Sequence, residues 1–267
     1  MRAHISYIAL MSDRPEALAA YYSTYFGLTA LGHSAAGDVS LTDGFYNLSI
    51  LKRRAELGED NDELGLHHFG LAIDDIREFE GRLEEFAPGA DLHGENGDVH
   101  HGDYRFTDGN GLAVSISTKH FNTPAKAGVY PSIHHLAMKV PDGDELVSLY
   151  GNLIGLQEVS SSIRRREEGS SARFAGDGST SWAIFPAQTA EVNEGSINRL
   201  GMNHFGFVVP DMEAMLAKLP ADGKTSRRPA NRPFAEFRTF DPDGNGIDVS
   251  QRLGYEVDPD VWVRAAL

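Results

Sequence analysis

The sequence contains no cysteine, so disulfide bonds, thiolate metal ligands, iron–sulfur clusters and a cysteine nucleophile are all excluded. It also lacks any run of about 18 apolar residues, and residues 1–10 do not have the basic start, apolar stretch and cleavage site of a secretory signal. These absences predict a cytoplasmic protein without a membrane span. Any bound metal would have to be held by nitrogen and oxygen donors.

Positive charge is scarce as well, because 24 Lys and Arg residues stand against 39 Asp and Glu residues and give a formal net charge of -15. Such a surface repels phosphate backbones and anionic lipid headgroups, so neither nucleic acid nor a membrane is expected as a partner. The 41% hydrophobic and 24% charged residues over 267 positions are typical of a globular protein. A typical domain of about 150 residues suggests two domains.

One short sequence motif occurs four times along the chain. Each copy is a histidine followed by an apolar, β-rich run, and the third and fourth copies end in the same Val-Pro-Asp sequence. Apolar runs of about six residues that stop at a turn residue are typical of buried strands. The copies begin at His4, His68, His135 and His204.

A helical pattern follows each of these strands, and short extended segments with Gly-rich turns follow each helix. The chain is therefore predicted to repeat a βαβββ module four times, which is an α+β architecture. Modules two and four share an Asp-Gly-Asn-Gly turn, so the pattern is a tandem duplication of a two-module domain. We predict domains at 1–120 and 133–267 with a linker at 121–132. The expected helices cover 15–26, 76–86, 144–154 and 212–219.

The repeated openings, together with the segment 240–248, which has the sequence Phe-Asp-Pro-Asp-Gly-Asn-Gly-Ile-Asp, resemble the vicinal oxygen chelate superfamily. This group is also called the glyoxalase/bleomycin resistance/dioxygenase superfamily. The resemblance covers essentially the whole chain. It implies that two modules form an incomplete barrel with a divalent metal inside. Four modules in two such domains resemble the type I extradiol dioxygenases.

Two histidines and a carboxylate are the expected metal ligands. A site without sulfur needs imidazoles and carboxylates, and a set of two histidines and one carboxylate leaves coordination positions open, as in non-heme Fe(II) enzymes. The candidates are His135 and His204, which open equivalent strands, and Asp248 in the last strand, where the family usually has Glu. Fe(II) is the expected metal, with Mn(II) and Zn(II) as alternatives. Because some family members pair the first module with the fourth, His4 is an alternative first ligand.

The first half of the chain is an internal control for this assignment. His4 and His68 open its strands in the same way as the histidines of the second half, but Ala113 stands where the carboxylate is expected. We therefore predict that the first domain is a metal-free structural copy and that the metal belongs to the second domain.

Three further residues are candidates for chemistry in the pocket. The resemblance implies a tyrosine ten residues before the last ligand and a histidine before the second, but Arg238 and Thr189 occupy those positions. Arg238 shares side-chain parity with Glu236. If it faces inward, it predicts an anionic group on the substrate, and a salt bridge to an acidic neighbour is the alternative. Glu236 and His134 are the candidate proton carriers.

These observations predict an Fe(II)-dependent ring-cleaving dioxygenase that acts on a catechol-like or hydroquinone-like small molecule in the catabolism of aromatic compounds. If Arg238 faces inward, the small molecule is expected to carry an anionic group. The alternatives are a non-redox isomerase, lyase or hydrolase in which the metal stabilises an oxyanion, and a non-catalytic ligand-binding or resistance protein. The stretch 253–267 is expected to cover the barrel or to pack between subunits of a homo-oligomer. The charged run 164–168 is interpreted as a solvated loop.

Overall fold

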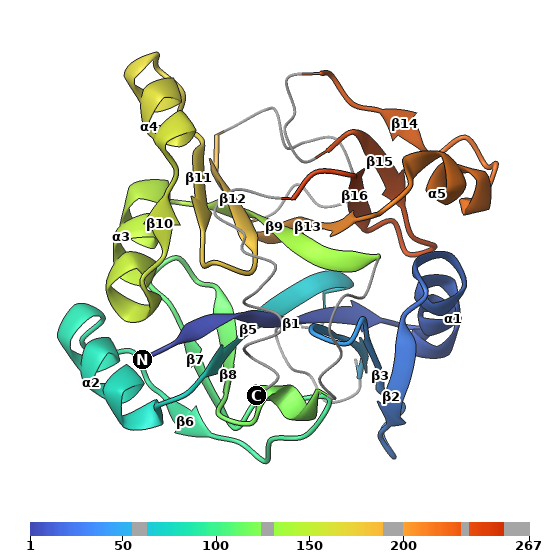
Figure 1. Cartoon of the computed structure of the whole chain (residues 1–267). Coiled ribbons are helices and arrows are strands. Elements are labelled where there is room, and N and C mark those ends of the chain that lie inside the picture. The colour runs from blue at the N-terminus through green and yellow to red at the C-terminus, as the bar shows by residue number, and fades with distance from the viewer. Residues whose placement is uncertain (55–62, 124–130, 189–199, 231–234, 254–267) are drawn as a thin grey trace.

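The computed structural model describes residues 1–54, 63–123, 131–188, 200–230 and 235–253. Figure 1 shows two sheets with helices at the periphery, the first sheet from the N-terminal half of the chain and the second from the C-terminal half. Each sheet has eight strands. This arrangement confirms the α+β class and the two tandem domains, each built from two βαβββ modules. No helix in the described ranges is long and apolar enough to cross a membrane.

The two sheets have the same topology. The strand order is β2-β3-β4-β1-β5-β8-β7-β6 in the first sheet and β10-β11-β12-β9-β13-β16-β15-β14 in the second. Module one is therefore paired with module two and module three with module four, and β1, β5 and β8 correspond to β9, β13 and β16. The first sheet consists of β1 (Ala3–Ser12), β2 (Thr29–His33), β3 (Val39–Thr42), β4 (Asn47–Lys52), β5 (Gly65–Ile73), β6 (His93–Gly94), β7 (Tyr104–Thr107) and β8 (Ala113–Ser117). The second consists of β9 (Ser132–Val140), β10 (Gln157–Glu158), β11 (Arg173–Gly176), β12 (Ser181–Pro186), β13 (Gly201–Val208), β14 (Ser226–Arg227), β15 (Phe237–Phe240) and β16 (Gly246–Ser250).

Each predicted helix is present after the first strand of its module. Three of the helices begin with an aspartate whose side chain accepts hydrogen bonds from backbone N–H groups of the first turn, namely Asp75, Asp142 and Asp211. Such a cap satisfies donors that the helix itself leaves unpaired, which explains why an aspartate follows the apolar run. The helices are α1 (Pro15–Phe26), α2 (Ile76–Phe86), α3 (Gly143–Ile154) and α5 (Met212–Lys218).

The charged run 164–168 is largely helical, so its interpretation as a loop was wrong. It belongs to α4 (Ser160–Glu167), which connects β10 to β11. The Ser162 hydroxyl donates to Glu158 at 2.8 Å and accepts from the backbone N–H of Phe174 at 2.9 Å. These bonds attach one side of the short helix to the sheet, and the arginines project from its other sides. These contacts with the sheet thus stabilise a helix in a segment whose polar composition had predicted a loop.

The two halves share one apolar core. Phe26 of α1 stacks on Phe207 of β13 with 4.3 Å between ring centroids, and Phe69 of β5 lies 5.4 Å from Trp182 of β12. Both pairs cross from the first half of the chain to the second, and all four side chains belong to the same buried cluster. The domains are therefore packed against each other through their strands and helices.

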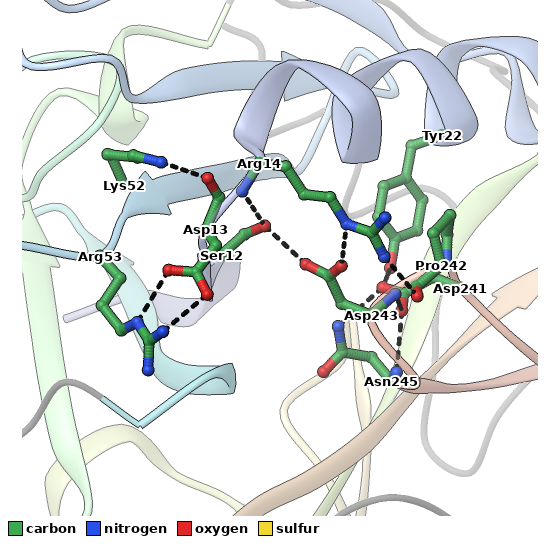
Figure 2. A network of polar contacts seen from close by, with 10 residues as sticks. All are labelled: Ser12, Asp13, Arg14, Tyr22, Lys52, Arg53, Asp241, Pro242, Asp243 and Asn245. Atoms are coloured by element: carbon green, nitrogen blue, oxygen red, sulfur yellow. Dashed lines mark hydrogen bonds and ion pairs between the residues drawn. The ribbon is translucent and has the colours of Figure 1, made fainter.

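A polar network ties the start of α1 to the turn that precedes β16 (Figure 2). The Ser12 hydroxyl and Arg14 Nε donate to the two carboxylate oxygens of Asp243, at 2.5 and 2.8 Å, and Arg14 Nη2 donates to the carbonyl of Pro242 at 2.7 Å. The Tyr22 hydroxyl donates to Asp241 at 2.8 Å. The first domain thereby holds the turn from which the last strand of the second domain begins.

Part of the predicted linker 121–132 has a different role. Phe121 is fully buried against the first sheet, and Ser132 is already the first residue of β9. Residues 124–130 and 254–267, which include most of the linker and of the C-terminal stretch 253–267, lie outside the described residues.

Candidate metal centre

Three neighbouring strands at the centre of the second sheet carry the predicted ligands. His135 of β9 lies opposite Gly206 of β13, and Gly206 lies opposite Asp248 of β16. His204 is two residues before Gly206 and therefore faces the same side of the sheet. A Cβ on Gly206 would lie only 3.3 Å from the Cβ atoms of both His135 and Asp248. A glycine between the outer strands thus leaves the space in which the three side chains meet.

The three side chains form a compact donor set. His135, His204 and Asp248 each offer one ligand atom, and these atoms lie within 4.8 Å of one another. His204 Nε2 is 3.2 Å from Asp248 Oδ2, and the two imidazole rings are 5.2 Å apart between centroids. All three residues are buried. Among the residues that the structure describes, this is the one group of three or more His, Asp or Glu side chains with such spacing.

The protonation states suit metal binding, which requires neutral imidazole and ionised carboxylate. Burial, helped by the charge of Arg238, lowers the pKa of His204 to about 4. Burial opposes ionisation of Asp248, but His204 and Arg238 outweigh it and hold the pKa of Asp248 well below its usual range. At neutral pH His204 is therefore neutral and Asp248 ionised, and with the imidazole of His135 they form a donor set of a kind that Fe(II), Mn(II) and Zn(II) all accept.

Arg238 contacts one of the predicted ligands, and its place beside a substrate stays a prediction. It lies on β15 directly opposite Asp248, and its Nε and Nη2 atoms donate to Oδ1 and Oδ2 of that residue at 2.6 and 2.9 Å. The salt bridge to an acidic neighbour, which the sequence left as the alternative, is the observed contact. A carboxylate has about four lone-pair positions, so Asp248 Oδ2 still has one for a metal. Arg238 thus fixes the orientation of the Asp248 carboxylate, a predicted ligand.

Glu236 makes contacts that are structural. Its carboxylate accepts from the Ser250 hydroxyl and from the backbone N–H of Gln251, both at 3.0 Å. The counterpart in the first sheet is Asp103, which accepts from Ser117 and from the backbone N–H of Thr118. Since both domains fasten the end of the last strand in this way, these contacts do not support the predicted role of Glu236 as a proton carrier.

His134 stays a predicted proton carrier. Its ring centroid is 6.0 Å from that of His135, but successive residues of a strand face opposite sides. Burial, followed by the neighbouring His135, lowers the pKa of His134 to about 3, so the residue is neutral at pH 7.

His4 lies away from the donor set. Its ring stacks on Phe45 with 5.2 Å between centroids, and its Nε2 atom is 3.5 Å from His120 Nε2 in the first half of the chain. The strand pairing shows that the counterpart of His135 is Tyr7, since each lies opposite the glycine of the neighbouring strand. The alternative in which His4 replaces His135 is therefore wrong for this fold.

The counterpart of Asp248 is likewise different from the one predicted. Ser115, not Ala113, lies opposite Gly70 and Arg105, as Asp248 lies opposite Gly206 and Arg238. The two Asp-Gly-Asn-Gly sequences occupy different positions in their turns, because Asp108 matches Asp241. The conclusion that the first domain lacks this carboxylate still holds. The counterparts of the ligands are Tyr7, His68 and Ser115.

Sequence reasoning missed one charged residue in the same barrel. Lys139 lies on β9, four residues after His135, and is buried. The available signal was a lysine within an otherwise apolar strand, at even spacing from a predicted ligand.

Comparisons with known proteins agree with this architecture. Residues 132–249 match the model of the Glyoxalase/Bleomycin resistance protein/Dioxygenase superfamily. An extradiol ring-cleaving dioxygenase from B. fuscum superposes with a TM-score of 0.67 at 15% identity, covering 96% of this chain and 74% of that one. The 2,3-dioxygenase LapB from Pseudomonas sp. KL28 gives 0.64 at 15% identity, covering 97% and 94%. The Mn(II)-bound glyoxalase from Novosphingobium aromaticivorans gives 0.67 at 18% identity, covering 96% and 84%. No curated protein matches the chain.

Proposed function

Since residues 132–249 belong to the Glyoxalase/Bleomycin resistance protein/Dioxygenase superfamily, we propose that the chain is a metal-dependent enzyme whose second domain cleaves the ring of a catechol-like or hydroquinone-like aromatic. Fe(II) is the proposed metal. The observation that carries the proposal is the buried set of His135, His204 and Asp248, which leaves further coordination positions to other ligands. When bound there, the metal supplies Lewis acidity toward two adjacent substrate oxygens and a position for O₂.

The residues of the chain prepare this site in two ways. Arg238 holds the Asp248 carboxylate in one orientation through two hydrogen bonds, so that a fixed oxygen faces the two histidines. Burial keeps His204 neutral, with a nitrogen lone pair available at physiological pH. The donor set is thus arranged before a metal arrives, which reduces the ordering that binding requires.

The wall next to the donor set suits a planar apolar ring. Six buried side chains form a cluster that is separate from the shared core, and Phe174 and Phe185 meet edge to face in it, with 6.1 Å between centroids. Ala137, two residues after His135 on the same face of β9, connects this cluster to the ligands. Aromatic and small aliphatic side chains favour burial of an aromatic substrate. The cluster consists of Ala137, Val159, Ala172, Phe174, Ala183 and Phe185.

A second candidate function is a non-redox isomerase, lyase or hydrolase that uses the same metal. One observation favours it: the position at which the family resemblance implies a proton-handling tyrosine is occupied by Arg238, whose guanidinium is engaged with Asp248. A reaction in which the metal stabilises an oxyanion does not need that tyrosine.

Oxygen uptake separates the two candidates. Protein loaded anaerobically with Fe(II) is expected to hold about one iron per chain and to consume O₂ only when a member of a panel of catechols and hydroquinones is added. The His204→Ala variant should lose both properties, while His93→Ala, which changes an exposed histidine of β6, should keep them. Iron without O₂ consumption across the panel would favour the non-redox enzyme, and a protein that takes up no metal would favour the ligand-binding protein.

A further inference from the structure

The predicted ligand His204 comes directly after a β-bulge in β13. Met202 and His204 lie opposite consecutive residues of β9, so β13 has one residue more than its partner strand over this step. The extra residue is Asn203. A bulge turns a side chain out of the regular alternation of a strand, and bulges are frequent next to active sites. Asn203 and His204 are both buried.

The side chain of this extra residue contacts the ring of the ligand. His204 Nδ1 lies 2.8 Å from Asn203 Oδ1. An amide oxygen can only accept, so the ring nitrogen donates and carries the hydrogen. The other ring nitrogen, Nε2, then presents a lone pair, and Nε2 is the atom that lies 3.2 Å from Asp248 Oδ2. A histidine that binds a metal through Nε2 needs this tautomer, and the hydrogen bond of its second nitrogen selects it.

The first barrel has the same bulge with a different residue in it. His67 is the extra residue of β5, and its Nδ1 atom lies 2.7 Å from Nδ1 of His68, the counterpart of His204. An imidazole nitrogen can donate or accept, so this contact does not select one tautomer of His68. The bulge therefore forms with histidine as well as with asparagine, and the fold does not require the amide at this position.

The arginines of the two barrels differ in a related way. Nη2 of Arg105 lies 3.2 and 3.3 Å from the two ring nitrogens of His68. A guanidinium can only donate, so it engages the lone pair that a metal would need. In the second barrel the corresponding Arg238 donates to Asp248. An asparagine in the bulge and an arginine engaged with a carboxylate therefore occur together at the predicted metal centre.

We propose that Asn203 is a positioning residue of the metal centre, which holds the Nδ1–H group of His204 so that the Nε2 lone pair is presented to the metal. The inference rests on the proposed function, since it requires a metal at His135, His204 and Asp248. Asn203 acts through the ring of His204. Outer hydrogen bonds of this kind fix the orientation of a ligating ring and raise its basicity, and their loss lowers metal affinity about tenfold to a hundredfold.

The first test measures the zinc affinity of the full chain by competition with a chelator. Asn203→Leu keeps a side chain of similar size but removes the acceptor, so zinc should bind about tenfold to a hundredfold more weakly. Asn203→Asp keeps an oxygen that can accept and should bind zinc at least as tightly as wild type. His67→Leu is the matched change in the bulge of the first barrel and should leave the zinc affinity unchanged.

A second variant keeps the test decisive if the leucine variant does not fold. Asn203→His installs the residue that the same bulge holds in the first barrel, so the strand should accept it. Because an imidazole does not select one tautomer of its neighbour, this variant should also bind zinc more weakly than wild type.

Nuclear magnetic resonance of the ring nitrogens separates positioning from a structural role. Zinc-loaded, isotope-labelled wild type and Asn203→Asp should show a hydrogen-bonded Nδ1–H group in His204, identified by its absence from His204→Ala. Asn203→Leu should lose this hydrogen-bonded signal while circular dichroism shows an unchanged fold. A residue that only stabilised the bulge would change the unfolding transition and leave the ring signal as it is in wild type.

The outcomes distinguish this role from the proposed function. Equal zinc affinity in wild type and in a folded Asn203→Leu or Asn203→His protein, or a ring signal unchanged in Asn203→Leu, would overturn the role of Asn203. Zinc binding that depends on Asn203, without O₂ consumption by the Fe(II)-loaded protein, would refute the ring-cleaving dioxygenase and leave the role of Asn203 intact. A wild type that takes up no metal would refute both proposals.

Discussion

The two barrels of this chain share one topology and differ in what fills them. In the second barrel the inner positions of the central strands carry His135 and Lys139 on β9 and Asp248 on β16. In the first barrel the counterparts are Tyr7, Met11 and Ser115. The βαβββ repeat therefore forms both with the set of two histidines and a carboxylate and without that carboxylate. The proposed functional residues are thus a local addition to the shared topology.

The first barrel is closed by its own chain. Phe121 stacks on Tyr7 with 4.6 Å between ring centroids, and a Cβ on Gly70 would lie only 2.4 Å from its ring. Gly70 is the counterpart of the glycine between the metal ligands, so the phenylalanine ring occupies the corresponding space. Phe121 reaches it from a turn in which His120, Phe121 and Asn122 all have φ near +50°. Such left-handed backbone costs free energy in non-glycine residues, and burial of the ring offsets that cost.

Removal of the ligand carboxylate should have the largest effect. Asp248→Ala removes a buried carboxylate that is paired with Arg238, so we expect a loss of about 3–5 kcal/mol in the free energy of unfolding together with complete loss of bound metal. The matched change Ser115→Ala in the first barrel removes no charge and should cost less than about 1 kcal/mol. Urea unfolding and metal analysis of both variants measure the contrast. A stable, metal-binding Asp248→Ala protein would contradict the assignment.

Phe121→Ala should destabilise the first barrel without touching the metal. Truncation of a fully buried phenylalanine leaves a cavity and costs about 3–5 kcal/mol. Because the ring lies against Tyr7 and Gly70 of the first sheet, the metal content at low denaturant should equal that of wild type. Loss of metal from the folded variant would contradict the proposal that the metal belongs to the second barrel alone.

Removal of the outer partner should weaken the metal without abolishing it. In Arg238→Gln the carboxylate of Asp248 loses the two bonds that orient it, and loss of such outer contacts lowers metal affinity by about tenfold to a hundredfold. The pKa of Asp248, which Arg238 helps to keep low, should rise, so metal uptake should also require a higher pH. Competition with a chelator at several pH values measures both effects. Unchanged affinity would show that Arg238 has no part in presenting the ligand.

Acid should destabilise the metal-free protein through buried histidines. Burial, followed by the charge of Arg2, lowers the pKa of His4 from 6.5 to about 4, and burial, followed by His4, does the same for His120. Between these values the unfolded chain binds more protons than the folded one, so stability falls as the pH drops from 6.5 toward 4. For His4 the loss approaches about 3 kcal/mol. His4→Gln should flatten the pH dependence of urea unfolding over this window, and an unchanged slope would argue against the buried neutral state.

The helices and the four modules were predictable because hydrophobic periodicity and turn residues act locally. The ranges 15–26 and 76–86 agree with α1 and α2 at both ends. The strand register was harder to predict, because a histidine followed by an apolar run does not determine which residue of the neighbouring strand lies opposite it. β1 has register shifts against β5, and the histidine of the first copy lies three residues before the inward position held by Tyr7. The sequence pattern of the first copy therefore repeats that of the third, although its histidine does not occupy the equivalent position in the sheet.

The contact of Arg238 depended on a neighbour that the sequence does not name. Arg238 faces Asp248 because the turn between β15 and β16 places the two residues opposite each other. A turn of a different length would have placed another residue of β15 opposite Asp248. The candidate residues could be chosen from the sequence, but which side chains they contact could be known only from the pairing of the strands.

The most direct test of the central claim is the metal stoichiometry of two matched variants. Wild type, His204→Ala and its counterpart in the first barrel, His68→Ala, would be loaded anaerobically with Fe(II) and analysed for metal per chain, with circular dichroism as the control for folding. The account predicts about one iron in wild type and in His68→Ala and none in His204→Ala. Iron retained by His204→Ala, or lost from a folded His68→Ala protein, would contradict it.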